Sequence, residues 1–511
     1  MQRRDFLSDL ARNAALCAVV PNLWRVKWRP SFADDPFQLG VACGDPTPTG
    51  GVLWTRLAPR PLEPDGGMPG PRTVVTWQVA DDDAFTKVVK EGRATAAPEL
   101  GYSVHADVDG LQPERWYFYR FTAGDAVSPV GRLRTTPAAG AQTPFVFAFA
   151  SCQLWEDGLY TAYEHMAREN VDLVAHLGDY IYEYGVRSTA VRSHATTEIR
   201  NLTDYRTRYA QYKTDPALKA AHLIAPWIVT WDDHEVDNNY AGSFGENLME
   251  SEEQMRARRA AAYQAWWEHQ PVRVPRVRSW ADLNITRSIE WGALARINML
   301  DGRQYRARQA CDGGTQLVPC GDWNDPERSM LGDAQEKWLE ERLRSNAHWQ
   351  VIANQTMVAP FDTERGTQQR LAMDNWSGYP QARDRLLSAI QRHAANRTVV
   401  ITGDIHSSWV NELHAGFSRP DRPIVAAEFV GTSITSGGDG GPMSARTRTA
   451  MAENPHVKWQ DARRGYVMCS VDAKAWNTEY KTVEYIRRPG APLLPPKKWR
   501  VEHGRPGVQQ A

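Results

Sequence analysis

Four short apolar stretches of this chain each lead into a cluster of polar, reactive side chains. The stretches are residues 145–150, 171–177, 227–231 and 399–402. A short apolar run that ends in turn-forming residues is typical of a buried strand at its carboxyl end. Ligands bind at that edge of an open α/β sheet, so we expect the four polar clusters to converge in one crevice.

The first quarter of the chain has the pattern of a β-sandwich. Residues 73–79 and 116–121 are dense in β-branched and aromatic types, which favour strands. Turn residues recur at the spacing of about 8–12 residues that sandwiches show. We therefore expect an immunoglobulin- or fibronectin-like β-sandwich over residues 35–137, followed by a Pro/Gly/Ala-rich linker at 137–141.

From residue 143 onward, strand-like runs alternate with helical patterns. The longer helical patterns cover residues 158–170, 204–213, 251–270, 332–345 and 380–394. A short helix is expected to restart at Pro216, because proline is favoured at the first helical position. Further strands are expected at 296–300 and 350–355. This alternation indicates an α/β catalytic domain over residues 143–486.

Three segments lack a regular pattern. Residues 240–249 and 311–326 are expected to form loops or insertions over the crevice. Residues 487–511 are rich in proline and basic side chains, so we expect a C-terminal tail there, poorly ordered beyond Val501.

Charge and the N-terminus bear on partners and location. The 511 residues carry a formal net charge of −1, so we expect no specific nucleic-acid binding and no attraction to anionic membranes. Arg3 and Arg4 precede a modest apolar stretch at 11–20, the pattern of a twin-arginine signal, which assigns residues 1–34 to signal and linker. No segment is long and apolar enough for a membrane span. We expect export by the twin-arginine machinery to a periplasmic or extracellular location; a disordered cytosolic N-terminus is the alternative.

The first two polar clusters combine a thiol, a carboxylate and a phenol. Asp179 follows Gly178, which permits a sharp turn after the strand and would leave the carboxylate at the sheet edge as a hard metal ligand. Tyr182 is three residues further on and can point to the same place if the turn enters a helix. Cys152 follows the first apolar run. Each alone has an ordinary explanation, a turn or core packing.

The other two clusters supply carboxylates and imidazoles. Asp233 lies in an acidic stretch beside His234, which could orient a ligand or act as an acid near neutral pH. An exposed acidic loop is the alternative. Asp404 and His406 are two residues apart and share one face of extended backbone, where they form either a ligand pair or an internal hydrogen bond.

Taken together, the clusters indicate two metal ions. Thiolate and phenolate donors suit a trivalent ion such as Fe³⁺, whereas all-nitrogen sites would indicate zinc. The carboxylates of Asp179, Asp233 and Asp404 suit Ca²⁺, Mg²⁺ or Mn²⁺ as a second ion. Two cations roughly 3.5–4 Å apart can activate water and stabilise an in-line displacement at phosphorus.

In their order along the chain, the motifs resemble the PhoD-type alkaline phosphatase family. The four motifs are Phe-Ala-Ser-Cys-Gln (149–153), His-Leu-Gly-Asp-Tyr-Ile-Tyr-Glu (176–183), Trp-Asp-Asp-His-Glu-Val-Asp-Asn-Asn (231–239) and Gly-Asp-Ile-His-Ser-Ser-Trp (403–409). Residues 37–45, 301–306 and 353–355 are similar to further stretches of that family. The resemblance covers nearly the whole chain.

The resemblance implies a fold and an activity. The fold would be an α/β (α+β) metallophosphoesterase-like layered β-sandwich flanked by helices, preceded by an N-terminal β domain. The activity would be that of a secreted, metal-dependent alkaline phosphatase that hydrolyses phosphate monoesters by attack of metal-activated water or hydroxide. Fe³⁺ and Ca²⁺ are the implied cofactors, and another divalent metal could replace Ca²⁺.

The resemblance also implies residue roles. The Fe³⁺ ligands would be Cys152, Asp179, Tyr182 and His406. Asp179 would bridge the two ions, and Asp233 and Asp404 would bind the second one. His234 would stabilise or protonate the leaving oxygen. In wider metallophosphoesterases an Asp-x-His motif occupies the place of Cys152 and an Asn that of Asp233, and both departures favour this subfamily.

Several assignments remain open at this point. Arg200 and Arg206 could clamp phosphate, or form a solvated helix face. Cys311 and Cys320 could form a disulfide, remain two thiols or clip a metal. A phosphodiesterase or phospholipase D-like hydrolase on the same scaffold is an alternative activity, and a metal-stabilised extracellular binding module is the non-enzymatic alternative.

Overall fold

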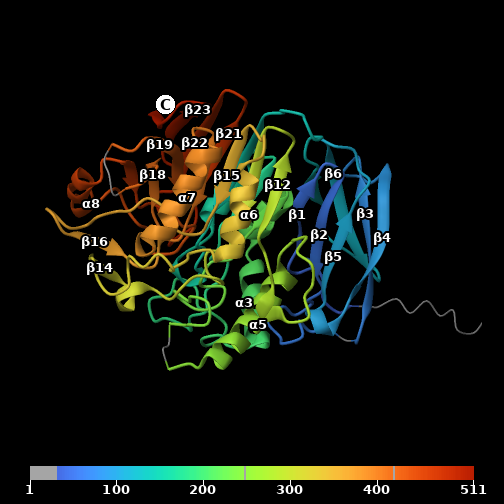
Figure 1. Ribbon diagram of the computed structural model, residues 1–511. Helices are drawn as coiled ribbons and strands as arrows, with labels where there is room; N and C mark the ends of the chain where they lie inside the picture. Colours follow the sequence, from blue (N-terminus) through green and yellow to red (C-terminus); the bar gives the residue numbers. More distant parts are fainter. Residues whose placement is uncertain (1–31, 69, 247–248, 418–420) are drawn as a thin grey trace, which may run out of the picture.

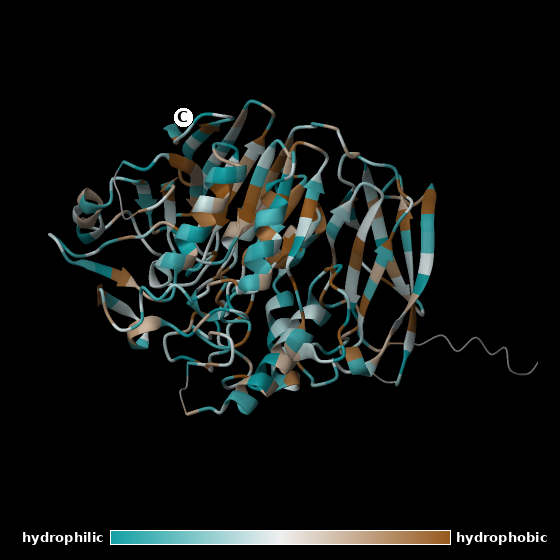
Figure 2. Cartoon of the chain, viewed as in Figure 1, coloured by the Kyte–Doolittle hydropathy of each residue, from teal (hydrophilic) through white to brown (hydrophobic). Residues whose placement is uncertain are grey.

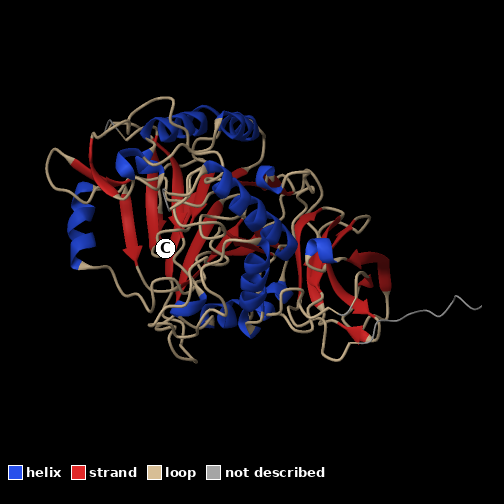
Figure 3. Cartoon of the chain, turned by 90° about the horizontal axis from the view of Figure 1, so that it is seen from below, coloured by secondary structure: helices blue, strands red, loops and turns tan. Residues whose placement is uncertain are grey.

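A computed structural model of the protein describes residues 32–68, 70–246, 249–417 and 421–511 (Figure 1). The twin-arginine pair and the apolar stretch that follows it therefore lie outside the described residues. Within the described part, two large sheets are stacked face to face, and helices cover their outer surfaces. Figure 3, seen from below, shows the strands between helices on either side.

The larger sheet has ten strands and draws on both ends of the chain. In order across the sheet they are β24 (Gln509–Gln510), β23 (Lys497–Glu502), β22 (Ala475–Thr482), β21 (Gly465–Val471), β9 (Phe145–Ala150), β10 (Leu173–His176), β11 (Trp227–Val229), β1 (Val41–Thr47), β2 (Gly50–Arg56) and β5 (Ser103–Val108). The neighbours β9, β10 and β11 are parallel, so their carboxyl ends meet at one edge.

The second large sheet has seven strands and forms the other half of the sandwich. In order across the sheet they are β12 (Arg287–Trp291), β13 (Ala295–Met299), β15 (Trp349–Ala353), β17 (Thr398–Thr402), β19 (Ile424–Val430), β18 (Ser408–His414) and β20 (Val457–Asp461). Strands β13, β15, β17 and β19 are parallel. The carboxyl end of β17 therefore carries Asp404 and His406 to the edge of this sheet.

Apolar cores on both sides of each sheet explain the continuous apolar runs in the sequence. Phe147 and Phe149 of β9 lie in one core with Val351 and Val399 of the facing sheet. The outer face of the ten-stranded sheet is covered by α2 (Thr161–Met166), α3 (Leu202–Lys213), α4 (Pro216–Ile224) and α5 (Glu252–His269). The outer face of the seven-stranded sheet is covered by α6 (Asp333–Leu343) and α7 (Pro380–His393). Figure 2 shows brown strands inside and largely teal surfaces on α6 and α7. The layered sandwich flanked by helices is thus confirmed.

The N-terminal sandwich is continuous with the ten-stranded sheet. Its second sheet contains β4 (Val88–Ala96), β3 (Thr73–Ala80), β6 (Trp116–Ala123), β7 (Ala126–Val127) and β8 (Gly131–Arg134), and it packs on β1, β2 and β5. Strand β1 pairs with β11 where Gly44 faces Trp227. A Cβ on Gly44 would lie 2.3 Å from the Trp227 carbonyl oxygen, so only glycine permits this approach.

Local signals mark where the main helices begin. The Asp215 side chain accepts hydrogen bonds from two N–H groups of α4, and Pro216 occupies its first position. Ser251 and Gln254 form a reciprocal capping box at the start of α5. A short helix, α8 (Ala445–Ala450), lies between β19 and β20 in the chain. Among the described helices, none has both the length and the apolar character to cross a bilayer.

One expectation about an irregular segment is wrong. Residues 487–511 are not a tail, because β23 and β24 complete one edge of the ten-stranded sheet. Trp499 and Val501 are only 7% and 4% exposed and lie in the core between the sheets. The loop or insertion expected at 311–326 contains β14 (Thr315–Val318), which pairs with β16 (Gln369–Ala372) in a small separate sheet.

Candidate metal centre

Side chains from the four strand ends lie together at the carboxyl edge of the sandwich. Cys152 follows β9, Asp179 follows β10 and His406 follows β17, and their donor atoms lie within 4.8 Å of one another. Two further groups meet the same spacing: Asp179 with Asp233 and His234, and Asp232 with Asp233 and Asp404. The structure thus brings all four sequence clusters into one continuous set of donors, linked through Asp179 and Asp233.

A left-handed backbone conformation recurs at the donor positions. The φ angles are +58° at Cys152, +55° at Asp179, +70° at Asp404 and +52° at His406. Residues other than glycine adopt this region rarely, at a cost of about 1–3 kcal/mol each, and such strain gathers at functional sites. The ends of β9, β10 and β17 therefore bend sharply at the residue that presents a donor, whereas Asp233 after β11 has no positive φ.

Tyr182 belongs to the first group of donors. Its hydroxyl donates a hydrogen bond to Asp179 Oδ2 at 2.9 Å and lies 3.3 Å from His406 Nε2. Ser436 Oγ donates to the Tyr182 oxygen at 2.7 Å. The phenol oxygen therefore touches two of the other donors, although residues 177–184 form a bend and not the helix on which the spacing argument depended.

The electrostatics of this group fit a strongly charged cation. Burial raises the pKa values of the Cys152 thiol, the Asp179 carboxyl and the Tyr182 phenol well above their ordinary ranges. Burial lowers the pKa of the His406 imidazole to about 3. Without a cation the three acids would keep their protons, whereas a bound metal would replace those protons and use the neutral imidazole as it stands.

The second group combines three carboxylates with a buried guanidinium. Arg303, with 0% exposed side chain, donates to Asp232 through Nε and to Asp404 Oδ1 through Nη2 at 3.2 Å. Asp233 Oδ2 accepts the Asn239 N–H at 2.7 Å, but Asp233 Oδ1 accepts no hydrogen bond among the described residues. Burial opposes ionisation, yet Arg303 and His234 hold the pKa of Asp233 well below its usual range. Asp233 Oδ1 faces Arg303 Nη2 at 3.5 Å without a hydrogen bond, and an ionised oxygen at this position fits a cation ligand.

His234 is held in one orientation beside the cluster. Its Nδ1 lies 2.8 Å from Glu183 Oε2, and its ring stacks on Tyr182 with centroids 4.1 Å apart. Glu183 Oε1 accepts the N–H of Asn238 at 2.8 Å, which fixes the carboxylate in turn. The ring is therefore fixed through Nδ1 and its stacking.

Three residues that sequence reasoning left without a role support the cluster. Glu235 accepts the backbone N–H groups of Asp179, Tyr180 and Asp232 at 2.9, 2.7 and 2.8 Å. Arg303 holds the second group, and Asp374 accepts a hydrogen bond from Arg303 Nη1 at 2.8 Å. The stretch 301–306 was similar to the family, and that similarity was the only sequence signal for Arg303.

The two candidate phosphate-binding arginines have other partners. Arg206 forms a bidentate pair with Glu268, at 2.6 and 2.5 Å. Arg200 pairs with Glu198 at 2.8 Å and also with Glu250. Neither guanidinium contacts the donor groups, so we no longer assign a substrate-binding role to either residue.

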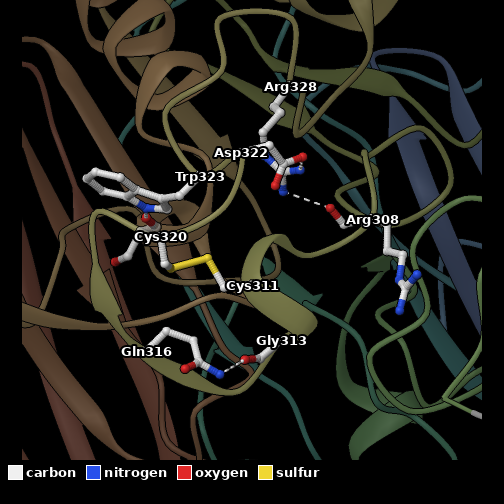
Figure 4. The surroundings of a disulfide bond; sticks show 9 residues. Arg308, Cys311, Gly313, Gln316, Cys320, Asp322, Trp323 and Arg328 are labelled. Atoms are coloured by element: carbon white, nitrogen blue, oxygen red, sulfur yellow. Dashed lines mark hydrogen bonds and ion pairs between the residues drawn. A yellow bond between two sulfur atoms is a disulfide. The ribbon is translucent and has the colours of Figure 1, made fainter.

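Cys311 and Cys320 are joined by a disulfide (Figure 4). The bridge packs in a small apolar cluster that contains Ala310, Val318, Leu371 and Met373. Trp323, which lies beside the bridge in Figure 4, donates its indole N–H to the Ser377 carbonyl at 2.7 Å. This cluster supports the segment that leads from β16 to Asp374.

Comparison with known families and proteins agrees with this geometry. Residues 147–480 match the family described as PhoD-like phosphatase, and residues 23–137 match its N-terminal domain. Alkaline phosphatase D of Bacillus subtilis (strain 168) is 46% identical over 503 residues, which cover 96% of this chain and 86% of that protein.

Solved structures give the same result. The structure titled "Structure of PhoD" is 46% identical, covers 94% of this chain and 93% of its own, and superposes with a TM-score of 0.91. Purple acid phosphatase PPD1 from yellow lupin (Lupinus luteus) seeds shares the fold, with a TM-score of 0.55 at 12% identity over 90% of this chain and 73% of its own. From these matches and the order of its motifs, the chain belongs to the PhoD-like phosphatase family.

Proposed function

We propose that this protein is a metal-dependent phosphatase that hydrolyses phosphate monoesters at the donor cluster. The observation that carries the proposal is the convergence of thiol, carboxylate and imidazole donors from Cys152, Asp179 and His406 within 4.8 Å of one another. Membership of the PhoD-like phosphatase family supplies the reaction class. The activity printed for the Bacillus subtilis relative, alkaline phosphatase, is carried over here as part of the proposal.

The donor types support an assignment of the two ions. Cys152, Asp179, Tyr182 and His406 would hold Fe³⁺, since thiolate and phenolate favour it over harder divalent ions. Asp233 and Asp404, with Asp179 shared, would hold Ca²⁺ or a similar oxygen-seeking ion. When bound, such a pair supplies an activated water or hydroxide and stabilises charge on the phosphoryl oxygens.

The surrounding residues orient the reacting groups. His234 keeps its ring in place through Glu183 and Tyr182, so that Nε2 can deliver a proton to the leaving oxygen. Arg303 separates and partly neutralises the carboxylates of Asp232 and Asp404. Ser436 fixes the Tyr182 hydroxyl. These contacts keep the donors in place before substrate arrives.

The proposal predicts a specific pattern of activity and metal content. Purified protein should contain iron, absorb visible light through charge transfer, and hydrolyse p-nitrophenyl phosphate faster than its bis ester. The Cys152→Ala and Asp179→Ala variants should lose activity while their far-ultraviolet circular dichroism is unchanged. Colourless, iron-free protein with full activity would refute the Fe³⁺ assignment, and faster turnover of the bis ester would make the protein a diesterase.

We also propose export through the twin-arginine machinery to the periplasm or beyond the cell. Arg3-Arg4 and the apolar stretch at 11–20 support it, and the Cys311–Cys320 disulfide is typical of oxidising compartments. Replacing Arg3 and Arg4 together by lysine should retain the protein in the cytoplasm, as measured by cell fractionation. Unchanged export of that variant would exclude the twin-arginine route.

A further inference from the structure

A cavity apart from the metal cluster lies at the N-terminal end of α7. We call it the α7 cavity; it is lined by residues of β16, the first turn of α7, the end of β18 and the segment 453–456. Its volume is about 510 Å³, within the roughly 300–1,000 Å³ of small-molecule sites. None of the proposed metal ligands lines it.

The wall of the α7 cavity contains a buried guanidinium that forms no hydrogen bond or ion pair with the residues that the structure describes. Arg383 is 6% exposed, yet Nε and Nη1 have no hydrogen-bond acceptor among the described residues, and no described carboxylate forms an ion pair with it. Its guanidinium lies 5.2 Å from the centre of the Phe417 ring. Burial lowers the pKa of Arg383 to about 10, so the group remains charged at neutral pH. Buried charges are normally paired, so this one indicates a missing anionic partner.

The start of α7 adds positive potential at the same place. Pro380 and Gln381 line the cavity, and the residue before them, Tyr379, makes no side-chain cap. The first turn of this 14-residue helix contains no acidic residue. A helix N-terminus without a capping side chain or an acidic residue in its first turn attracts anions through its backbone N–H groups and dipole.

A carboxylate on the same wall narrows the class of anion. Asp384 lines the cavity, and its buried Oδ1 accepts no hydrogen bond from the described residues. Glu453 also lines the cavity but is exposed. A carboxylate oxygen beside a cationic donor repels an anion that carries no proton. It accepts a hydrogen bond from an anion that carries a hydroxyl hydrogen. Phosphate has that hydrogen, whereas sulfate near neutral pH does not.

We propose that the α7 cavity is an accessory site for inorganic phosphate, with Arg383 donating to its oxygens and Asp384 accepting its hydroxyl hydrogen. A phosphate monoester loses its last proton near pH 6, whereas inorganic phosphate keeps one proton well above neutral pH. At pH 8 the site therefore selects the free ion over its esters. Inorganic phosphate is the product of the proposed function, but the binding rests on the cavity and does not require turnover.

Isothermal titration of the metal-loaded protein at pH 8 tests the site. Native protein should bind inorganic phosphate at a position that rejects sulfate. Arg383→Met should weaken that binding by about tenfold or more, the effect of losing one charge-assisted contact. Arg385→Met is the matched control, because Arg385 is an exposed residue of the same helix paired with Glu336; it should bind as the native protein does.

Two further variants separate this site from the metal cluster. Cys152→Ala should retain the phosphate site, because Cys152 does not line the α7 cavity. Asp384→Asn should admit sulfate, since an amide no longer repels an unprotonated oxygen. If Arg383→Met destabilises the fold, Arg383→Lys keeps the charge without the planar fork and should bind phosphate more weakly than native protein. Native affinity in Arg383→Met, or loss of all phosphate binding in Cys152→Ala, would overturn the proposal.

Discussion

At the scale of single residues, the buried carboxylates around the cluster divide into two kinds. Glu235 accepts three backbone N–H groups and is saturated by the protein itself. Asp233 keeps one buried oxygen that accepts no hydrogen bond from the described residues and lies 3.5 Å from Arg303 Nη2. The first kind shapes the turns after β10 and β11, and the second is left for a ligand. Hydrogen-bond counting thus distinguishes a structural acid from a candidate metal ligand two positions away.

His234 is the residue whose role is most directly testable. Because its Nδ1 is engaged by Glu183 and its ring stacks on Tyr182, we assign it to proton delivery. The His234→Ala variant should lower kcat by about 10²–10⁴-fold, the usual contribution of general acid catalysis, with iron and divalent-metal content unchanged. Steady-state kinetics measures kcat, and elemental analysis measures the metal content of the same variant. Activity that falls only in proportion to lost metal would make His234 a ligand.

Lys213 gives a second prediction, about stability and pH. Its amine is buried between the rings of Trp54 and Tyr180, at 4.3 and 5.0 Å, and burial lowers its pKa to about 7. In the unfolded chain the pKa is about 10.4. Between these values only the unfolded state binds the proton, so this group makes stability rise with pH from about 7 to 10. Below pH 7 its contribution is flat.

The Lys213→Met variant should reduce that slope. Urea unfolding at pH 7 and pH 9.5, followed by tryptophan fluorescence, would show a smaller increase in the unfolding free energy than in the native protein. Lys337→Met, on the exposed face of α6, serves as a control that leaves the slope unchanged. An identical slope in native protein and Lys213→Met would show that the amine is protonated in the folded state.

At the scale of elements, the contact between β1 and β11 joins the N-terminal sandwich to the catalytic layers. A side chain at Gly44 would meet the carbonyl oxygens of Trp227 and Pro271, each at 2.3 Å. Gly44→Ala should therefore destabilise the protein by about 1–3 kcal/mol through overpacking. Gly441→Ala, where a Cβ meets nothing within 4 Å, is the matched control. Equal unfolding midpoints for the two variants in denaturant would contradict this account.

Elements with strong local signals could be predicted from sequence. The helical pattern at 251–270 and the proline at 216 marked α5 and α4, and unbroken apolar runs marked β9 and β17. Strand β23 was missed because its only local signal, Trp499 and Val501 among basic residues, is weak. Its strand conformation depends on pairing with β22, a contact between segments that periodicity cannot anticipate.

The candidate metal centre also contains residues that the sequence identified and residues that it could not identify. Donors at strand ends were identifiable because each follows an apolar run and precedes a turn. Arg303 could not be given a role, since its role depends on carboxylates from three other segments, Asp232, Asp374 and Asp404. The role of Arg206 stayed open because nothing local to it reveals Glu268, which is 62 residues away.

At the scale of the whole molecule, the two donor groups should respond differently to chelation. Asp233 and Asp404 offer only oxygen, which binds divalent ions exchangeably, whereas Cys152 and Tyr182 offer donors that retain iron. Prolonged EGTA treatment should therefore abolish phosphatase activity while the visible absorbance of the iron site persists, and added Ca²⁺ should restore turnover. EGTA that has been saturated with Ca²⁺ beforehand is the control. Activity that survives EGTA would exclude an exchangeable calcium site.

The position of β9 in the ten-stranded sheet has a consequence for biosynthesis. This strand leads to Cys152 and lies between β10 and β21, with Phe145 opposite Val471. One of its two neighbours is therefore translated more than 300 residues after it. Until β21 has been translated, the edge of β9 that pairs with it has no partner, and the backbone N–H and C=O groups of that edge can pair with a wrong strand. Nascent chains should thus depend on chaperones until release, and the candidate metal centre can be enclosed only once translation is nearly finished.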